Sequence, residues 1–524
     1  MIFKLQQKNI SAVKAGMLYY LHQEETKMKK IISLSVIFLQ IFMFDSMAQS
    51  MKFTSIKITD SPIISFRIQF RVGSVNEPDG KEGLNQLTAD LISQGGYGLV
   101  TYKEMLEKLY PMAGRIGVIP NKEVTTFVAE IHKDNLEKFW NIFEQVITNP
   151  RMDENDFIRL KDLQLNYIKN TLRNENDENL GKAVLEEMLY ENHPYGNIEA
   201  GKISSLNSIN LDDAKNFYKK YYTQTNLTVG IAGNFDKKFI DKIKFDLVKL
   251  PKGKTNVVKL TQPNKIQDVE INLIEKKTIS TALSFGFPVN LTRSSKEFLA
   301  LMIANSYLGE HRTFNGVLMN KMRGDRGLNY GDYSYIENFI QEGGSTFPLP
   351  NIPRQQQFFS VWIRPVANAN RHFSLRMAIR EIELLIKNGI PEKDFEETKK
   401  FLINYSKLWV QTQSRRLGYQ MDSDFYKTKY LIDEIAKKMP KISKKQVDDA
   451  VRKYLNTKNI KVAVVSENAQ MFMKDLLENN VSPMTYQHSN ISQHILDEDR
   501  DIQKYSFKIN PDKIKIINVE NVFE

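Results

Sequence analysis

The two halves of the chain repeat the same order of sequence signals, and this repetition constrains the fold more than any other feature. Residues 149–157 (NPRMDENDF) precede a long charged helical pattern, and residues 388–395 (NGIPEKDF) precede a second one. Further along each half, residues 211–214 (LDDA) and 447–450 (VDDA) lead into an apolar strand pattern. Units of roughly 200 residues that occur twice predict two duplicated domains and not a solenoid of short repeats.

Each half also opens with an apolar strand pattern that is followed by a helical one. These patterns occupy residues 64–72 and 83–93 in the first half, and residues 282–288 and 295–308 in the second. Strands at both ends of a half, with helices between them, are typical of an α+β fold. We therefore expect each half to form an antiparallel-rich sheet with helices on one face.

A polar stretch punctuated by Pro251, Gly253 and Pro263 predicts the linker between the halves. The tail of the chain alternates over residues 504–509 and is apolar over residues 514–519, which predicts one or two strands added to a domain edge. The predicted segments are an upstream extension with a signal peptide (1–48), an N-terminal domain (49–248), the linker (249–268), a C-terminal domain (269–480) and the strand-forming tail (481–524).

The region before residue 49 has the parts of a secretory signal peptide. Met28 opens a short basic segment, residues 31–44 are apolar but too few to span a bilayer, and Ala48 ends a small-residue exit. We expect the true start at Met28, cleavage after Ala48 and export to the periplasm, either free or associated with the outer membrane. No second apolar span follows, so we expect no integral membrane segment in the mature chain.

The composition excludes several chemistries. The 524 residues include no cysteine, which excludes disulfides, thiolate catalysis and cysteine-ligated zinc. The formal net charge is +11, and residues 1–48 carry six lysines and three acids, so about +8 remains on the mature chain. The basic residues are interleaved with acids and form no basic stripe, so nucleic acid is not an expected partner.

The helix predicted at residues 83–91 (GLNQLTADL) has the spacing of a metal-site helix without its metal ligands. In the inverted zinc motif H-x-x-E-H, two imidazoles lie on one helix face and the Glu activates a bound water. Those three positions are here Gln86, Ala89 and Asp90. The apolar positions keep helical spacing and predict that the helix packs onto its sheet through Leu84, Leu87 and Leu91.

Further segments give the chain a resemblance to a known family. They are residues 73–77 (GSVNE), 149–150 (NP), 193–196 (HPYG), 233–235 (GNF), 304–309 (ANSYLG) and 323–330 (RGDRGLNY). With them, the chain resembles the insulinase/pitrilysin-like inverzincin peptidases, in the short-subunit group of mitochondrial processing peptidase and its bacterial relatives. The resemblance covers roughly residues 53–480 and implies that the two domains form half of a clam-shell chamber.

The resemblance also implies which zinc-site functions are missing. The family uses two histidines, a glutamate base and a distal glutamate ligand, because zinc takes N and O donors and keeps a place for water. Gln86 and Asp90 replace the histidines, Ala89 replaces the base, and Tyr167 aligns with the distal glutamate. The nearest acid, Asp162, lies more than a helical turn away from Tyr167. We therefore expect no metal in this chain and no self-sufficient peptidase.

Two interpretations of Gln86 and Asp90 remain open at this point. They could hold another ion weakly, or they could be solvated or hydrogen-bonded polar residues on adjacent helical turns.

The second half matches the family more closely. There the C-terminal domain supplies an Arg and a Tyr, seven residues apart, to the substrate carbonyl at the zinc, and Arg323 and Tyr330 match these positions. A guanidinium and a phenol suit an oxygen that gains negative charge in a tetrahedral transition state. A structural role is the alternative, with Tyr330 starting a strand and Arg323 pairing with an acid.

The resemblance therefore implies a non-zinc subunit of a heteromeric zinc metallopeptidase. Its expected partners are a zinc-bearing H-x-x-E-H sister subunit and an extended peptide that adds to an exposed sheet edge. Zinc is expected in the sister subunit, and no cofactor is expected in this chain. The alternative is a catalytically silent scaffold or peptide-binding subunit of the same family.

Two other features have structural interpretations. Residues 341–354 hold three prolines and two glycines, which predicts a loop that rims the cleft, contacts the partner or lies on the surface. His193 begins the sequence HPYG, which predicts a rigid turn where Pro194 sets the backbone and Gly196 takes a special φ.

Overall fold

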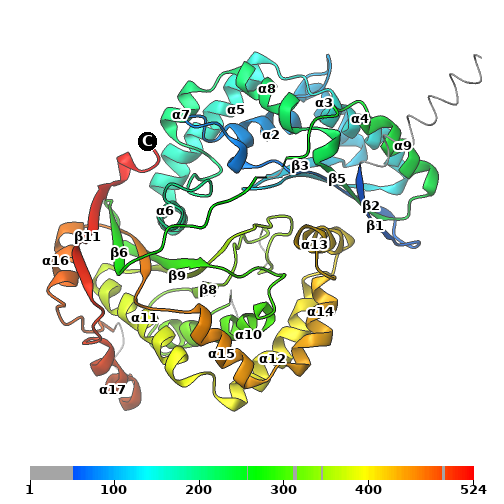
Figure 1. The fold of residues 1–524 in the computed structure, drawn as a ribbon. Coiled ribbons are helices and arrows are strands. Elements are labelled where there is room, and N and C mark those ends of the chain that lie inside the picture. The colour runs from blue at the N-terminus through cyan, green and yellow to red at the C-terminus, as the bar shows by residue number, and fades with distance from the viewer. Residues whose placement is uncertain (1–50, 257, 311–315, 344–345, 487–489) are drawn as a thin grey trace, which may run out of the picture.

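The computed structural model describes residues 51–256, 258–310, 316–343, 346–486 and 490–524. The predicted upstream extension and signal peptide lie outside the described residues. Two α+β domains face each other, with most of their helices on the outside of the molecule (Figure 1). The predicted α+β class with two domains is confirmed.

The two sheets share one strand order. In spatial sequence, the first sheet consists of β1 (Lys52–Lys57), β5 (Leu227–Gly233), β2 (Ile63–Phe70), β4 (Thr125–His132) and β3 (Arg115–Pro120). The second consists of β11 (Ile509–Asn518), β6 (Val269–Glu275), β10 (Ile460–Ser466), β7 (Ser280–Val289), β9 (Gln357–Ala367) and β8 (Asp332–Tyr335). Apart from β11, each strand of the second sheet has its counterpart in the first. In both sheets the counterpart pairs β1·β5 and β6·β10 are parallel and the later pairs are antiparallel, as duplication requires.

The helices follow the same two-domain division along the chain. The first half contains α2 (Leu84–Gln94), α3 (Tyr102–Leu109), α4 (Leu136–Thr148), α5 (Glu154–Asn166), α6 (Asp177–Leu189), α7 (Ile203–Ser208), α8 (Leu211–Tyr221) and α9 (Lys237–Leu247). The second half contains α10 (Phe298–Leu308), α11 (Arg371–Asn388), α12 (Glu392–Leu408), α13 (Gln413–Tyr426), α14 (Leu431–Lys438), α15 (Lys444–Tyr454), α16 (Ala469–Leu477) and α17 (Gln493–Ile502). Two further segments are π-helical, η4 (Tyr167–Glu175) and η6 (Met319–Gly324).

Strand β2 shows how the sequence divides the two faces of the first sheet. Phe66 and Ile68 are buried in the core, where the Phe66 ring lies 5.4 Å from the Trp140 ring of α4. The alternate residues are polar, and Arg67 is buried against the second domain. Because successive strand residues point to opposite faces, one face of β2 contacts the helices of its own domain and the other contacts the opposite domain.

The two domains exchange one helix each. Helix α6 of the first domain packs on β7, β9 and β10 of the second sheet, and α13 of the second domain packs on β1, β2 and β5 of the first. Gly181 of α6 faces β7, where a Cβ would lie 3.5 Å from the Ser284 hydroxyl, an ordinary contact distance. On the other side, Gly230 of β5 lies under the Met421 side chain of α13. Helices were predicted on one face of each sheet. The exchanged helix also covers part of the other face.

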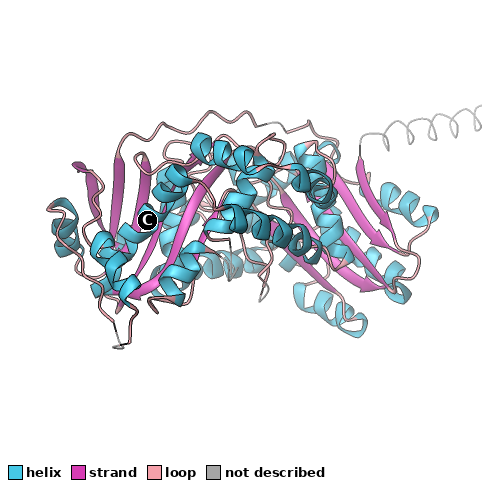
Figure 2. Ribbon diagram, turned by 90° about the horizontal axis from the view of Figure 1, so that it is seen from below, coloured by secondary structure: helices cyan, strands magenta, loops and turns pink. Residues whose placement is uncertain are grey.

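The linker and the tail connect these units. Residues 251–268 form no helix or strand in their described part and run along one side of the molecule between the domains (Figure 2). In the tail, the alternating residues 504–508 form no strand, and β11 alone joins the edge of the second sheet beside β6. Among the described helices, none is both long enough and apolar enough to cross a membrane.

We expect Leu417→Ala in α13 to lower the free energy of unfolding by about 2–5 kcal/mol, the range for a large-to-small change in a buried site. Leu417 is fully buried in a small cluster with Ala232 of the first sheet and Met421. Urea unfolding followed by circular dichroism measures the change. The control is Leu106→Ala on the outer helix α3, where the side chain is largely exposed and a change below about 0.5 kcal/mol is expected. Equal effects of the two substitutions would contradict the helix exchange.

Candidate functional site

A cavity of about 810 Å³ lies between the domains. Its wall includes side chains from α2, η4, α6, β8, β9 and the loop after β8. Gln86, Asp90 and Tyr167, the three positions that align with zinc ligands in the sequence, all line this cavity. Ala89 is buried and is not among the lining residues. The fold thus still brings the former ligand positions together.

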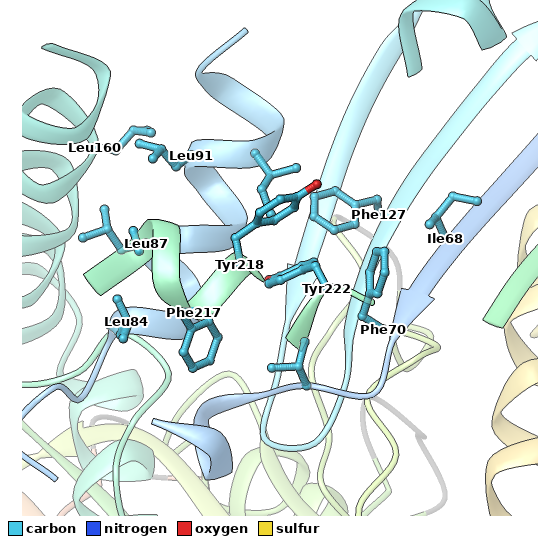
Figure 3. Close-up of a cluster of buried hydrophobic side chains, with 14 of the residues drawn as sticks. Ile68, Phe70, Leu84, Leu87, Leu91, Phe127, Leu160, Phe217, Tyr218 and Tyr222 are labelled. Carbon is cyan, nitrogen blue, oxygen red and sulfur yellow. The ribbon is translucent and has the colours of Figure 1, made fainter. Parts of the chain in front are cut away.

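Helix α2 keeps its position through packing and through a cap from outside the helix. Gly83 occupies the N-cap with a φ of 96°, and a Cβ there would lie 2.7 Å from the Ala200 carbonyl oxygen. Because glycine offers no capping side chain, Oε1 of Glu77 accepts the bond from the Asn85 N–H at 2.8 Å. Burial raises the pKa of Glu77 to about 8. Figure 3 shows the apolar side of the helix, with Leu84, Leu87 and Leu91 facing side chains of α5 and α8.

Asp90 is hydrogen-bonded within its own helix. Nε2 of Gln94 donates to Oδ1 of Asp90 at 3.2 Å, and the Gln86 side chain also bonds the carboxyl. Burial raises the pKa of Asp90 to about 6, and these hydrogen bonds only partly oppose the rise. The structure therefore favours the interpretation of Gln86 and Asp90 as a hydrogen-bonded pair.

The residues at the former ligand positions do not fit zinc. Zinc in proteins takes thiolate, imidazole and carboxylate donors, whereas Gln86 offers an amide and Tyr167 a phenol. Burial raises the pKa of the Tyr167 phenol, which keeps this group in its protonated form. Over the described ranges, no group of three or more His, Cys, Asp or Glu side chains is placed to hold a metal ion.

Tyr167 also marks a change of helix type that the sequence did not predict. It begins η4, so the long charged helical pattern after residues 149–157 is α-helical only as far as Asn166. A π-helical turn is rare and occurs frequently at functional sites. Tyr167 and Leu172 of this segment both line the cavity.

A buried charge cluster in the wall of the cavity joins the two domains. Arg354 donates through Nη1 to Oε1 of Glu186 at 2.8 Å, and its Nη2 lies 3.4 Å from Oε1 of Glu199. Nζ of Lys122, which is fully buried, lies 3.2 Å from the same Glu186 oxygen. These partners are far apart in sequence, so no spacing rule could have identified them. Each carboxylate here is compensated by a cation from the same chain.

A second cluster lies on the α6 wall. Nζ of Lys182 lies 2.6 Å from Oε1 of Glu178 and 3.9 Å from the centre of the Trp362 ring. Nε of Arg364 donates to the other Glu178 oxygen at 3.0 Å. Nearby charges from Lys182 and Arg364 lower the pKa of Glu178 despite its burial. This wall is therefore aromatic and charged, with its charges paired.

The Pro- and Gly-rich loop lies at the rim of the cavity. Gln341, Gly343 and Arg354 line the cavity, which agrees with the prediction that this loop rims the cleft. Nδ2 of Asn351 donates to Oδ1 of Asp422 on α13 at 3.0 Å. The loop therefore reaches from the cavity to α13.

The structure places Arg323 and Tyr330 outside this cavity. Arg323 lies in η6, and its guanidinium carbon lies 5.2 Å from the centre of the Tyr330 ring. Both side chains are exposed, and Tyr330 is 75% exposed. Nδ2 of Asn329 donates to Oδ1 of Asp332 at 2.8 Å and to the Arg364 carbonyl at 2.9 Å, which anchors the backbone beside Tyr330. The two residues thus form an exposed, preformed pair ahead of β8.

His193 lies in a turn. Its Nδ1 accepts a bond from the Tyr195 N–H at 3.0 Å, and its Nε2 lies 3.0 Å from the Thr261 carbonyl oxygen. The prediction of a special φ at Gly196 is wrong, because the φ of this residue is not positive. Glycine is required there for close approach, since a Cβ would lie 2.4 Å from the Tyr190 carbonyl oxygen.

The chain is similar to two family models, to several known proteins and to solved structures. Residues 52–201 match the model of the insulinase family (peptidase family M16), and residues 208–402 match the model of the peptidase M16 inactive domain. The chain is 21% identical to an uncharacterized zinc protease, YmxG, of Bacillus subtilis, over 78% of this chain and 94% of that protein. It is also 21% identical to a non-peptidase homolog of Helicobacter pylori, over 77% and 89% of the two chains. The crystal structure of a peptidase M16 inactive domain from Pseudomonas fluorescens superposes with a TM-score of 0.70 at 19% identity, covering 79% of this chain and 95% of the other.

We expect the combined substitutions Gln86→His, Asp90→His and Tyr167→Glu to create a zinc site, because the three positions line one cavity wall. The purified variant should hold about one zinc per chain by mass spectrometry of the metal, and the wild type should hold far less. The control carries Gln86→His and Asp90→His without the third ligand. Tight stoichiometric zinc in the wild type, or no gain of the triple variant over the control, would contradict this geometry.

Asp90→Asn should raise the melting temperature at about pH 8 and have a smaller effect at about pH 4. The folded-state pKa of Asp90 is raised to about 6, above the ordinary value of about 3.9. The fold therefore favours the protonated carboxyl, whose contribution to stability is present below about pH 4 and is lost as the pH rises through about 6. Asparagine cannot ionise and avoids this loss.

The matched control is Asp212→Asn, which removes an exposed carboxyl on α8. A melting-temperature difference between wild type and Asp90→Asn that does not change with pH would contradict the raised pKa.

Proposed function

The chain belongs to the insulinase (M16) peptidase family as an inactive homologue, and from this premise we propose that it is the non-zinc subunit of a secreted heteromeric zinc metallopeptidase. In this proposal the chain supplies half of a chamber, a strand edge for an extended peptide, and the Arg323–Tyr330 pair. The zinc belongs to a sister subunit with an intact H-x-x-E-H motif. Export to the periplasm, free or at the outer membrane, is part of the same proposal and rests on the signal-like residues 28–48.

The proposal rests on one observation: this chain lacks the zinc ligands of the family but keeps the family's Arg and Tyr. Gln86, Asp90 and Tyr167 line the cavity but offer no zinc ligand set. Arg323 and Tyr330 are retained, and they lie exposed, stacked and outside this chain's own cavity. A surface pair of this kind is accessible to another chain, where a guanidinium and a phenol could donate to a developing oxyanion.

The geometry also supports the peptide-binding part of the proposal. Strand β3 is an edge of the first sheet, and its Val118 and Pro120 line the cavity. An edge strand presents unpaired backbone groups to which an extended peptide can add as a further strand. The chamber and this edge are retained without the metal site, which supports a role in holding peptide.

The second candidate is a catalytically silent scaffold or peptide-binding subunit. It is favoured by the same exposure of Tyr330, because a surface stack of Arg323 on Tyr330 is also stable without a catalytic role. The two candidates differ in one result, which is the activity of the complex when the pair is altered.

In a complex with the zinc-bearing sister subunit, Arg323→Ala and Tyr330→Phe should each lower kcat by about 10²–10³, the effect of removing one oxyanion donor. Tyr330→Phe keeps the ring and removes only the hydroxyl, so KM and co-purification should change little. Cleavage of casein by the co-expressed complex provides the measurement.

The control for this experiment is Arg452→Ala, which removes an exposed guanidinium on α15. Unchanged kcat in both test variants, with the complex intact, would exclude the assisting role and leave the silent subunit.

A further inference from the structure

The last described residues connect the second domain back to the first. Strand β11 pairs with β6 of the second sheet up to Asn518, which lies opposite Glu275. The chain then turns through η9 (Val519–Asn521) and reaches α7 of the first domain, as the red end of the ribbon shows (Figure 1). We call residues 519–524 the clasp. The six residues of the clasp directly follow the last residue that pairs with the second sheet.

The clasp makes several hydrogen bonds to the first domain. Nε of Arg173 donates to the Val522 carbonyl at 2.6 Å, and its Nη2 donates to Oε2 of Glu524 at 3.0 Å. The N–H groups of Ile203 and Ser204 donate to the carbonyl oxygens of Phe523 and Glu524, at 3.0 and 2.8 Å. These N–H groups belong to the first turn of α7, where an intrahelical acceptor is missing, and the α7 N-cap residue Lys202 makes no side-chain cap. The clasp therefore caps α7.

Apolar contacts fix the clasp further. Val519, Val522 and Phe523 are buried in a core cluster that consists mostly of first-domain residues, with Phe523 only 4% exposed. Phe523 has a φ of 59°, which is strained for a bulky side chain. Such a conformation persists only where the surroundings hold the residue in place. The clasp is thus seated in a specific site and does not merely lie on the surface.

The clasp lies behind one wall of the cavity. Arg173 belongs to η4, and the same π-helical segment supplies Tyr167 and Leu172 to the cavity. The residues that lead into α7 also line the cavity, through Ile198, Glu199 and Ala200. The side chain of Arg173 is only 4% exposed with the clasp in place, so loss of the clasp would remove these acceptors and uncover the guanidinium. The wall would then have to rearrange.

We propose that residues 519–524 are a clasp through which the second domain holds the cavity wall of η4 and α7 in place, in an intramolecular peptide-binding site on the first domain. The site takes a short segment with two adjacent buried apolar side chains followed by an acid. Arg173 and the first turn of α7 provide its polar recognition. Release of the clasp would loosen the wall that contains Tyr167, and this holds whether or not a zinc-bearing partner exists.

The test uses the full chain with Val522→Asp and Phe523→Asp, because charged side chains cannot enter the buried site. The sequence has no cysteine, so a single nitroxide label can be placed at Lys169→Cys, an exposed position on η4. We expect the label to become mobile in the clasp variant by electron paramagnetic resonance. A second label at Lys103→Cys on α3 should not change. Adding a synthetic peptide of residues 517–524 should restore the immobile spectrum, whereas a peptide with the two Asp substitutions should not.

The matched control is Asn518→Asp with Asn521→Asp, which adds the same charge at exposed positions flanking the clasp contacts. Its η4 label should remain immobile. If the double Asp variant fails to fold by circular dichroism, Phe523→Ala replaces it, with the same expected direction. An η4 label that stays immobile in the folded clasp variant, or a mobile label that the wild-type peptide does not restore, would overturn the proposal.

Discussion

The structure depends on the exchange of α6 and α13 between the domains, because each exchanged helix covers a face of the opposite sheet. On the first sheet, Arg67 is buried and donates through Nη1 to Oδ1 of Asn351 at 2.8 Å and through Nε to the Ser414 carbonyl at 3.1 Å. Burial lowers the pKa of Arg67 to about 10, and the charge of Asp422 on α13 opposes this effect. Removing one partner of a buried charge costs about 3–5 kcal/mol. The domains therefore cannot separate as independent units without exposing or isolating such groups, and the cavity between them is a fixed part of the fold.

The repeat of the chain was sufficient to predict the class and the duplication, but not the exchange. The strand patterns of β2 and β7 and the helical spacing of Leu84, Leu87 and Leu91 depend on neighbours in sequence, which makes them visible in a single chain. The position of α13 depends on contacts with residues more than 300 positions away, such as Ser414 with Arg67. The start of η4 at Tyr167 is set by tertiary packing, because nothing in the local residues distinguishes a π-helix from an α-helix.

In the candidate site, too, the sequence predicted some residues and missed those that meet only in the fold. The spacing of the zinc motif identified Gln86 and Asp90, the family resemblance identified Tyr167, and all three line one cavity. The sequence could not identify the cluster of Arg354, Lys122 and Glu186, because the order of charged residues along a chain does not show which of them pair in the fold. Helix α2 is present without zinc ligands because its packing and its chemistry use different side chains. Its stability comes from apolar packing and the Glu77 cap, whereas its chemistry came from side chains on the opposite face, so one could be lost without the other.

The pairing of charges within the cavity limits how a peptide could be recognised there. Glu178 and Glu186 already bind Lys182, Arg364 and Arg354 of the same chain. A wall whose charges are compensated internally gains little from a charged peptide side chain, since a new ion pair must replace an existing one. Among the described strands, only β4 pairs with the edge strand β3, which leaves the other side of its backbone free of a strand partner. On the proposed function, main-chain pairing would therefore supply most of the affinity, and the aromatic surface near Trp362 would supply shape selection rather than selection by charge.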